Sequence, residues 1–232
     1  MRTDRKDWDL SILVLVPVLN EEQGIGPTLT EFKHYLDECQ FLVVDGKSKD
    51  QTVNISKSLG ADVLFQEGTG KGNAISYAIQ HLNRDFDYFV FTDGDYTYPA
   101  EVVPRMIDIL EENPHIGMVC GNRFGSYLQV DAFPNLFYFG NRIIGIVHNL
   151  LNGISLSDPL TGLRVIRGKI IKDWKPKSSG FDIEVELNHH VERQGYNIAE
   201  IDIPYRKRLG QKKLKMKDGL TIFKRIIVES TC

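Results

Sequence analysis

Short, continuous apolar runs alternate with helix-like segments throughout the first half of the sequence. Such runs are typical of strands that are covered on both faces. They predict strands at residues 10–16, 41–44, 62–65 and 88–91. The segments between and after them predict helices at 25–36, 52–59, 73–82 and 99–110. Repeated strand, helix, strand units form a parallel sheet with right-handed crossovers, so we predict an α/β fold with a mainly parallel sheet flanked by helices.

The second half is less regular. Apolar runs predict strands at 118–121, 163–166 and 198–203, and inward-facing apolar residues at helical spacing predict a helix at 181–194. No internal repeat, low-complexity tract or Pro/Gly-rich linker marks a boundary between domains. A chain of 232 residues is of a size that forms one domain, and a single domain is our prediction.

The composition excludes several classes of protein. With 42% hydrophobic and 25% charged residues the chain is typical of globular proteins, and its net charge of -3 gives no reason to expect nucleic-acid binding. Its three cysteines are far apart and form no CxxC pair, which indicates neither a disulfide framework nor a zinc site and favours a reducing compartment. The amino terminus lacks a signal-peptide core, and no apolar stretch of about 18 residues is present to span a bilayer. We therefore predict a cytoplasmic protein.

Polar residues follow each of the four strands predicted in the first half. In strand order they are Pro17, Asn20 and Glu21, then Asp45, then Glu67, then Asp93 and Asp95. Ligands of parallel α/β sheets bind beyond the carboxyl ends of the strands, where the loops converge. The pattern therefore predicts a binding site at that edge of the sheet.

The pair of acids after the fourth strand, Asp93-Gly94-Asp95, has two interpretations. Asp and Gly are common turn residues, so the segment can be an ordinary turn. Alternatively, two neighbouring carboxylates suit Mg²⁺ or Mn²⁺, which takes one or two protein carboxylates and completes its shell with water and the phosphates of a ligand.

The glycine-rich segment 68–74, GTGKGNA, fails the Walker pattern, because Phe65 and Gly72 stand where a glycine and a Ser or Thr are required. It is either a plain loop or a flexible turn that presents Lys71 to an anionic ligand before a helix. Within the helix at 181–194, Glu186 and His189 have metal-ligand spacing, but no second pair accompanies them. Glu184 and Glu186 are better interpreted as ligand-facing or structural acids.

The segment 205–217 is strongly basic. Seven Lys or Arg and no acid lie between Arg206 and Lys217, and an amphipathic tail follows. Such a segment is often just solvated, but next to an amphipathic helix it favours binding to phosphates or to an anionic membrane surface. The segment 133–151 is rich in apolar residues yet too polar to span a bilayer. We predict peripheral contact with a membrane.

The motifs, taken together and in order, resemble those of family 2 glycosyltransferases of the GT-A fold. They are Pro17-x-x-Asn20-Glu21, VVDGKSKDQT (43–52), GKGNA (70–74), DGDYTYPAE (93–101), GNR (121–123), DPLTGLRVI (158–166), GFDIEVEL (180–187) and IPYRKR (203–208). Among that family, the chain is most similar to polyprenyl-phosphate glycosyltransferases of the dolichyl-phosphate mannose synthase type.

The resemblance implies roles for particular residues. For the donor, Pro17, Asn20, Glu21 and Asp45 would surround the base and ribose, Lys71 would lie beside the nucleotide, and Asp93 and Asp95 would form the DxD motif, with Asp95 the main ligand of Mg²⁺ or Mn²⁺. For transfer, Arg123 would hold the acceptor phosphate, Asp158 would face the sugar and acceptor, and Arg206, Arg208 and Lys213 would close over the phosphates. The implied organisation is a nucleotide-sugar-binding half at 8–125, an acceptor-binding half at 126–216 and an amphipathic carboxyl-terminal helix at 217–232.

The resemblance also implies the reaction. An inverting transfer would move a sugar from a nucleotide-diphosphate sugar to a polyprenyl or dolichyl phosphate on the cytoplasmic face of a membrane. The chain departs from many mannose synthases after Asp95, where Tyr96-Thr97-Tyr98-Pro99 follows, and this argues against GDP-mannose as donor. It also has a single Asp in Asp45-Gly46-Lys47-Ser48, where many relatives have two, and this Asp-Gly-x-Ser form is more similar to relatives that use UDP-sugars. Two alternatives are a glycosyltransferase with a sugar-hydroxyl acceptor, for which Asp158 would be the general base, and a non-catalytic nucleotide-binding scaffold recruited to membranes.

Overall fold

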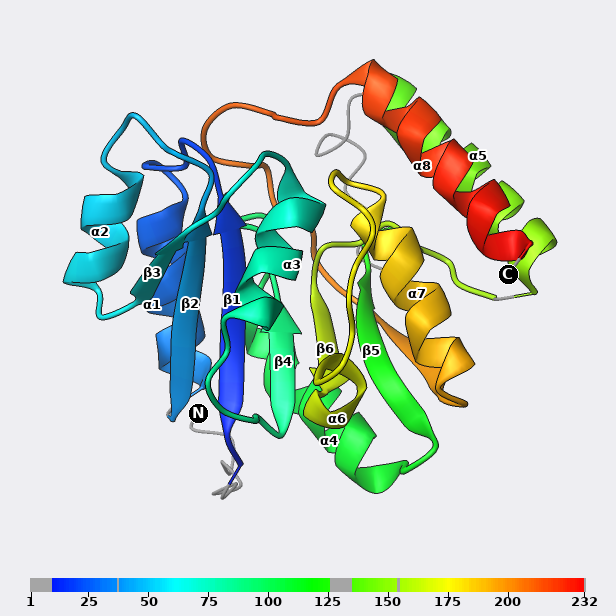
Figure 1. The fold of residues 1–232 in the computed structure, drawn as a ribbon, viewed down its shortest axis with the longest axis horizontal. Helices are drawn as coiled ribbons and strands as arrows, with labels where there is room; N and C mark the ends of the chain where they lie inside the picture. The colour runs from blue at the N-terminus through cyan, green and yellow to red at the C-terminus, as the bar shows by residue number, and fades with distance from the viewer. Residues whose placement is uncertain (1–9, 37, 126–134, 154, 232) are drawn as a thin grey trace.

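In the part of the chain that the structure describes, a mixed sheet of seven strands forms the centre (Figure 1). The computed structural model describes residues 10–36, 38–125, 135–153 and 155–231. The strands lie in the order β3-β2-β1-β4-β6-β5-β7. Their bounds are β1 Ile12–Val18, β2 Cys39–Asp45, β3 Asp62–Phe65, β4 Tyr88–Phe91, β5 Ile116–Asn122, β6 Arg164–Arg167 and β7 Asn197–Asp202. Only β6 runs antiparallel to its neighbours, so the predicted α/β fold with a mainly parallel sheet is confirmed.

The helices predicted from the sequence are present with ends shifted by a few residues, and the helices at 135–152 and 168–171 are additional ones that the sequence pattern does not predict. They are α1 Ile25–Tyr35, α2 Thr52–Ser58, α3 Lys71–Gln80, α4 Val103–Glu112, α5 Asn135–Asn152, α6 Gly168–Ile171, α7 Ile183–Arg193 and α8 Met216–Ser230, with a 3₁₀ turn, η1, at Ala100–Val102. The helix predicted at 99–110 is divided into η1 and α4. Pro104 lies in the first turn of α4, where its missing N–H costs no helical hydrogen bond.

Two apolar clusters cover the two faces of the sheet. One contains Phe32 of α1 and Met106 of α4, and the other contains Ala78 of α3 and Leu187 of α7. All four residues of β4 are buried between them, which explains why this strand reads as a continuous apolar run. The core therefore fixes the carboxyl ends of β1, β2 and β4 at one edge.

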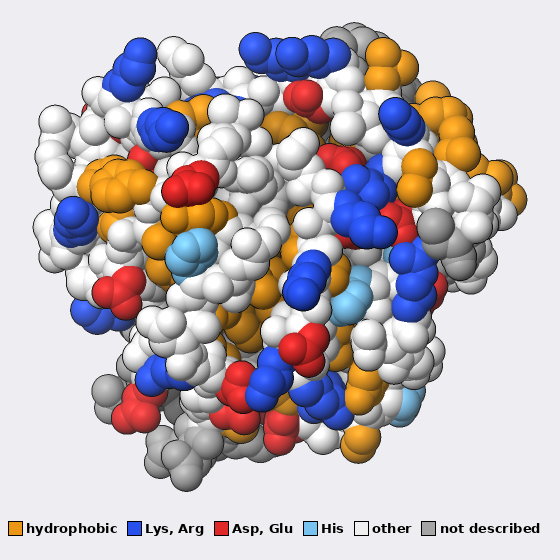
Figure 2. Space-filling model, viewed as in Figure 1, with side chains coloured by type: hydrophobic (Ala, Val, Ile, Leu, Met, Phe, Trp, Pro, Cys, Tyr) orange, Lys and Arg blue, Asp and Glu red, His pale blue; other side chains and the backbone are white. Residues whose placement is uncertain are grey.

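The helices α5 and α8 lie side by side beyond the sheet (Figure 1). Ile222 and Ile226 of α8 pack against Val185 of α7, and Arg225 of α8 lies 3.1 Å from the Asp182 carboxylate before α7. Hydrophobic side chains, coloured orange, gather at the upper right of Figure 2, where α5 and α8 lie. The exposed apolar side chains of the two helices, among the described residues, are Ile143, Ile146, Leu150, Leu151, Leu220, Phe223, Ile227 and Val228. We call these residues the apolar row. Among the described residues, no helix has the length and apolar character needed to cross a membrane.

The predicted division into a donor half, an acceptor half and a tail stays a prediction. Residues 37, 126–134, 154 and 232 of these segments lie outside the described residues, as do the first nine residues.

Candidate active site

A cavity of about 730 Å³ opens at the carboxyl ends of β1, β2 and β4. The loops after these strands form one side, and the segment after β7 crosses the other side. Eight of the residues predicted from sequence line it: Pro17, Glu21, Lys71, Asp93, Asp95, Arg123, Arg208 and Lys213. The predicted edge of the sheet is therefore where these side chains meet.

Lys71 bridges two carboxylates inside this cavity. Its Nζ atom lies 2.6 Å from Asp93 Oδ1 and 2.8 Å from Glu184 Oε1. Burial lowers the pKa of Lys71, but the charges of Asp93 and Glu184 outweigh burial and raise that pKa above its ordinary value. Lys71 is therefore a fixed positive charge at the start of α3.

The glycine-rich loop holds Lys71 against the start of α7. Gly70 has a φ of 98°, and a Cβ atom there would lie 2.3 Å from the carbonyl oxygen of Ser179. A Cβ atom on Gly72 would lie 2.4 Å from the carbonyl oxygen of Ser178. Both glycines allow an approach that a larger residue would block. The GTGKGNA segment is thus a packed turn rather than a free loop.

Asp95 is held in a buried position. Its Oδ1 atom accepts hydrogen bonds from the N–H and the hydroxyl of Thr97, at 3.1 and 2.6 Å, and its Oδ2 atom lies 3.4 Å from Arg208. Burial and the nearby charge of Asp93 raise the pKa of the Asp95 carboxyl. A cation beside Asp95 offsets this cost, and Arg208 supplies one here.

The segment after β7, which we call the strap (205–214), crosses the cavity. The backbone N–H groups of Arg206 and Leu209 donate hydrogen bonds to the carbonyl oxygens of Thr97 and Asp95, at 3.1 and 3.0 Å. The strap therefore attaches directly to the loop that carries the two acids.

Side chains of the strap make further contacts. Arg208 and Lys213 each lie 3.0 Å from the Glu21 carboxylate. Burial is the largest influence on the pKa of Glu21 and raises it, although both cations act in the opposite direction. Arg206 points elsewhere, because it forms two hydrogen bonds with Glu31 of α1, at 2.6 and 3.0 Å, and does not line the cavity.

Arg123 and Asp158 form a buried bidentate pair. Arg123 Nε lies 2.6 Å from Asp158 Oδ2, and Arg123 Nη2 lies 2.8 Å from Asp158 Oδ1. Asp158 Oδ2 also accepts the backbone N–H of Arg123 at 3.1 Å. Only Arg123 lines the cavity. Asp158 thus orients Arg123 and directs neither of its oxygens into the cavity.

Asn20 and Asp45, also predicted as donor-binding residues, support the loops in this structure. Asn20 Oδ1 accepts the N–H of Lys49, and Asp45 Oδ2 accepts the N–H groups of Lys47 and Ser48. Neither residue lines the cavity. Asn20, Lys47 and Tyr96 all have positive φ values of 50°, 70° and 66°. Strained backbone of this kind clusters at functional sites, and these three residues follow β1, β2 and β4.

The acids of this cavity fit a divalent cation bound together with a nucleotide. No cluster of three or more His, Cys, Asp or Glu side chains is found in the described part of the chain. Mg²⁺ needs no such cluster, because it is bound by one or two carboxylates together with waters and phosphates. Asp95 and Asp93 provide two carboxylates, and the positions of Arg208 and Lys213 show that this edge of the cavity attracts positive charge.

Sequence reasoning missed several residues of the cavity. Gln66 lines it, whereas the neighbouring Glu67 at the third strand end is exposed. Tyr98 and Tyr205 lie edge to face, with ring centres 5.4 Å apart, and both line the cavity. Glu31, which anchors the strap, lies in the middle of a predicted helix. No motif marks it, because its partner Arg206 is 175 residues away.

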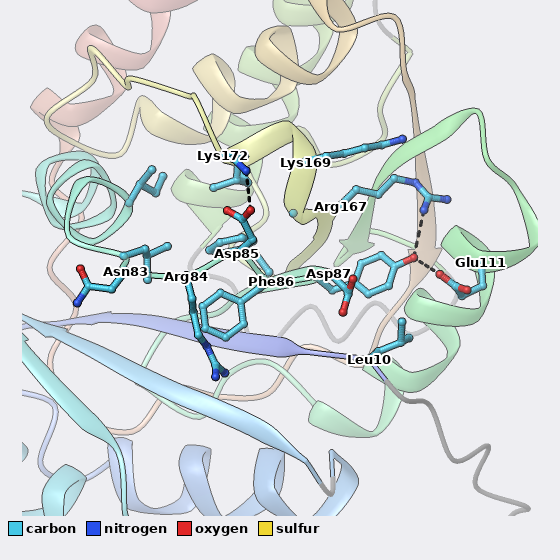
Figure 3. A pocket seen from close by; sticks show the side chains of 16 residues that line it. Leu10, Asn83, Arg84, Asp85, Phe86, Asp87, Glu111, Arg167, Lys169 and Lys172 are labelled. Carbon is cyan, nitrogen blue, oxygen red and sulfur yellow. Dashed lines mark hydrogen bonds and ion pairs between the residues drawn. The ribbon is translucent and has the colours of Figure 1, made fainter.

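A second cavity lies near the amino ends of β1 and β4, at the end of these strands opposite to the first cavity (Figure 3). It has a volume of about 640 Å³ and contains the hydroxyl of Tyr88, which contacts Glu111 and Arg167. Lys172 pairs there with Asp85 at 2.5 Å. These polar groups are paired with one another, and none of the residues predicted as functional lies there. The cavity beneath the strap is therefore the better candidate.

Comparison with known proteins identifies the family of the chain. The model of the family described as glycosyl transferase family 2 matches residues 13–174. The chain belongs to this family. The predicted membership is thereby confirmed, and the protein is a glycosyltransferase.

The relatives extend over most of the chain. A dolichyl-phosphate hexose transferase of Haloferax volcanii is 34% identical over 220 residues, which cover 93% of this chain and 92% of that protein. Glycosyltransferase AglJ of the same organism is 31% identical over 84% of this chain, which spans only 63% of that protein's length.

A solved structure supports the fold. Glucosyl-3-phosphoglycerate synthase of Mycobacterium tuberculosis, in complex with UDP, superposes with a TM-score of 0.75 and 20% identity, covering 96% of this chain and 81% of that chain. The GT-A fold implied by the sequence motifs is therefore confirmed.

Proposed function

We propose that this glycosyltransferase transfers a sugar from a nucleotide-diphosphate sugar to a polyprenyl phosphate, such as dolichyl phosphate, with Mg²⁺ or Mn²⁺ as cofactor. The observation that carries the proposal is the charge arrangement of the cavity. Among the described residues, six Lys or Arg and four Asp or Glu side chains line it. An excess of positive charge beside a pair of acids suits a metal-bound diphosphate and a second phosphate group. The hexose transferase of Haloferax volcanii is named for a dolichyl-phosphate substrate, which supports this acceptor.

The chemistry of the donor follows from charge. The bond between the sugar C1 atom and the diphosphate oxygen breaks, and the nucleoside diphosphate leaves with additional negative charge. Lys71, Arg208 and Lys213 would stabilise that charge. A metal ion held by Asp95, with Asp93 beside it, would neutralise part of it as a Lewis acid. We propose a UDP-sugar as the donor, on the basis of the Asp-Gly-x-Ser form at residues 45–48, and the sequence that follows Asp95 argues against GDP-mannose.

The chemistry of the acceptor requires no strong general base. The second pKa of a phosphate monoester is about 6, so the acceptor phosphate is largely ionised at neutral pH. Its oxygen forms the new bond to C1 from the face opposite the diphosphate, which inverts the anomeric configuration. Arg123, oriented by Asp158, would hold this phosphate. A hydroxyl acceptor would need a free base, and both oxygens of Asp158 contact Arg123 instead.

A membrane surface on the cytoplasmic side would bring the lipid to the protein. The helix α8, which carries part of the apolar row, directly follows the basic strap in the chain, and Leu150 and Leu220 are 79% and 76% exposed. Apolar residues beside basic ones bind anionic bilayers by combining burial with electrostatic attraction. We expect the double substitution Leu150→Ser and Leu220→Ser to reduce co-sedimentation with anionic liposomes at low salt. Phe65→Ser, at an exposed apolar site on β3, is the matched control. Equal binding by both variants would contradict membrane contact through this row.

The reaction is tested with labelled UDP- and GDP-sugars, Mg²⁺ or Mn²⁺, and a short polyprenyl phosphate. We expect nucleoside diphosphate release that depends on the lipid phosphate and a product with inverted configuration. Transfer to a sugar hydroxyl but not to the lipid would favour the other acceptor class. Absence of nucleotide release in every combination would favour a nucleotide-binding scaffold and contradict the proposal.

A further inference from the structure

Three acids at the start of α7 have different surroundings. Asp182 Oδ1 accepts the backbone N–H of Gly180 at 3.1 Å, and its Oδ2 atom contacts Arg225. Glu186 accepts the backbone N–H groups of Lys177 and Ser178, at 2.7 and 2.6 Å. Asp182 and Glu186 therefore stabilise the local fold.

Glu184 differs from its two neighbours because part of its carboxylate is unused. Its Oε1 atom contacts Lys71 at 2.8 Å, but its Oε2 atom is buried without a hydrogen-bond partner among the described residues. The side chain is only 7% exposed and lines the cavity beneath the strap. A buried carboxylate oxygen without a partner is costly, so such an atom in a binding cavity indicates a ligand that donates a hydrogen bond.

The position of Glu184 indicates which part of the ligand it meets. Lys71 lies between Glu184 and Asp93, so its ammonium group separates Glu184 from the acids proposed to bind the metal and diphosphate. Leu160 and Phe181 line the same cavity and supply apolar surface. A carboxylate can only accept hydrogen bonds, and phosphates at neutral pH offer acceptors. The hydroxyl groups of the transferred sugar are the donors that fit.

We propose that Glu184 recognises the transferred sugar by accepting a hydrogen bond from one of its hydroxyl groups, and that the donor is a neutral hexose rather than a hexuronate. This inference rests on the proposed function. The Oε2 atom of Glu184 is buried, negatively charged and without a hydrogen-bond partner among the described residues, so a sugar bound beside it meets a carboxylate oxygen. An anionic carboxylate on the sugar would be repelled there.

Calorimetric binding to the full chain with Mn²⁺ tests the proposal without requiring turnover. The probes are UDP, UDP-glucose and UDP-glucuronate, with GDP and GDP-mannose as a second series. For each variant, the affinity for the nucleotide sugar is divided by the affinity for the nucleotide alone. We expect Glu184→Gln to lower this ratio for the neutral sugar by roughly tenfold or more, the effect of losing a hydrogen bond to a charged group. The ratio for UDP-glucuronate should rise.

Two further variants separate the contributions. Glu184→Asp retains the charge but shortens the side chain, so the neutral sugar should bind more weakly while glucuronate stays excluded. Glu192→Gln removes a charge from the far end of α7, outside the cavity, and should leave every ratio unchanged. Thermal unfolding of each variant verifies that the fold is retained.

The outcomes distinguish this inference from the proposed function. An unchanged ratio in Glu184→Gln, or an equal loss of affinity for UDP alone, would overturn the inference. A shifted ratio in a protein that transfers no sugar would uphold the inference and overturn the proposed function. Failure to bind both nucleotides would overturn both.

Discussion

Replacement of Asp158 by Asn tests whether this residue orients Arg123 or acts as a base. The two side chains are 1% and 8% exposed and share bonds of 2.6 and 2.8 Å. Removing one partner of a buried pair costs about 3–5 kcal/mol. Asn retains one acceptor oxygen, so we expect the free energy of unfolding to fall by an amount near the lower end of this range. In a domain of this size about 1 kcal/mol shifts the unfolding temperature by roughly 2–4 °C, so Asp158→Asn should lower it by roughly 6–12 °C.

The assay combines thermal unfolding with transfer kinetics measured well below the unfolding temperature. The kcat/KM for the polyprenyl phosphate should fall, because Arg123 loses its fixed orientation, while nucleotide affinity changes little. Arg123→Met combined with Asp158→Asn should recover part of the lost stability but none of the activity, since it removes the unpaired buried cation. Asp85→Asn, which removes the exposed pair with Lys172, should leave the unfolding temperature unchanged.

An inactive Asp158→Asn protein with an unchanged unfolding temperature would refute this reasoning. The pair would then contribute nothing to stability, and Asp158 would be better assigned as a general base for a hydroxyl acceptor.

Three further predictions concern the loop, pH and the metal. Gly70→Ala should weaken nucleotide binding by tenfold or more, since the added Cβ atom would meet the Ser179 carbonyl oxygen. Gly60 has a similar φ of 82° but open space around it, so Gly60→Ala should only strain the backbone. Calorimetry compares the nucleotide affinities of the two variants. Burial, with the nearby charges of His148 and Arg193, lowers the pKa of His189 to about 4. In the unfolded chain the histidine has a pKa near 6.5, so it takes up a proton at a higher pH than in the folded protein. The free energy of unfolding should therefore be highest above about pH 6.5 and fall by up to about 1.4 kcal/mol per pH unit between pH 6.5 and 4. In thermal unfolding experiments, the unfolding temperature of His189→Gln should depend less on pH across this range. Removal of divalent ions with EDTA should abolish transfer, and added Mn²⁺ or Mg²⁺ should restore it; activity that survives EDTA would contradict a metal cofactor.

The sheet could be predicted in part because strands that are buried on both faces appear in the sequence as continuous apolar runs. The runs at β1 and β4 are continuous because both faces are covered, and β3 and β4 have the predicted bounds. The position of β6 between β4 and β5 could not be predicted, because no pattern in the sequence indicates which strands are neighbours. A strand as short as β6, with three buried residues and one half-buried residue, has the same composition in either direction, so its antiparallel orientation depends on contacts between distant segments.

The site shows the same limit. Sheet topology alone brings the strand ends together, which is why Glu21, Asp93 and Asp95 meet in one cavity. The direction of each side chain depends on finer geometry. Asn20 has a left-handed backbone conformation and uses its amide within the loops, and Arg206 turns away to Glu31. Side-chain pairs between residues far apart in the chain produce no periodic pattern, so they cannot be predicted from a single sequence.

The contact between α8 and α7 has a practical consequence for protein production. An exposed apolar row invites removal of the last helix to improve solubility. Such a shortened protein would lose Arg225, the partner of Asp182, and would uncover Val185 next to Glu184. The binding cavity would thus be damaged by a change made far from it. Polar substitutions confined to the outer face of α8, at Leu220 and Phe223, are the better route to a soluble protein that keeps its donor site intact.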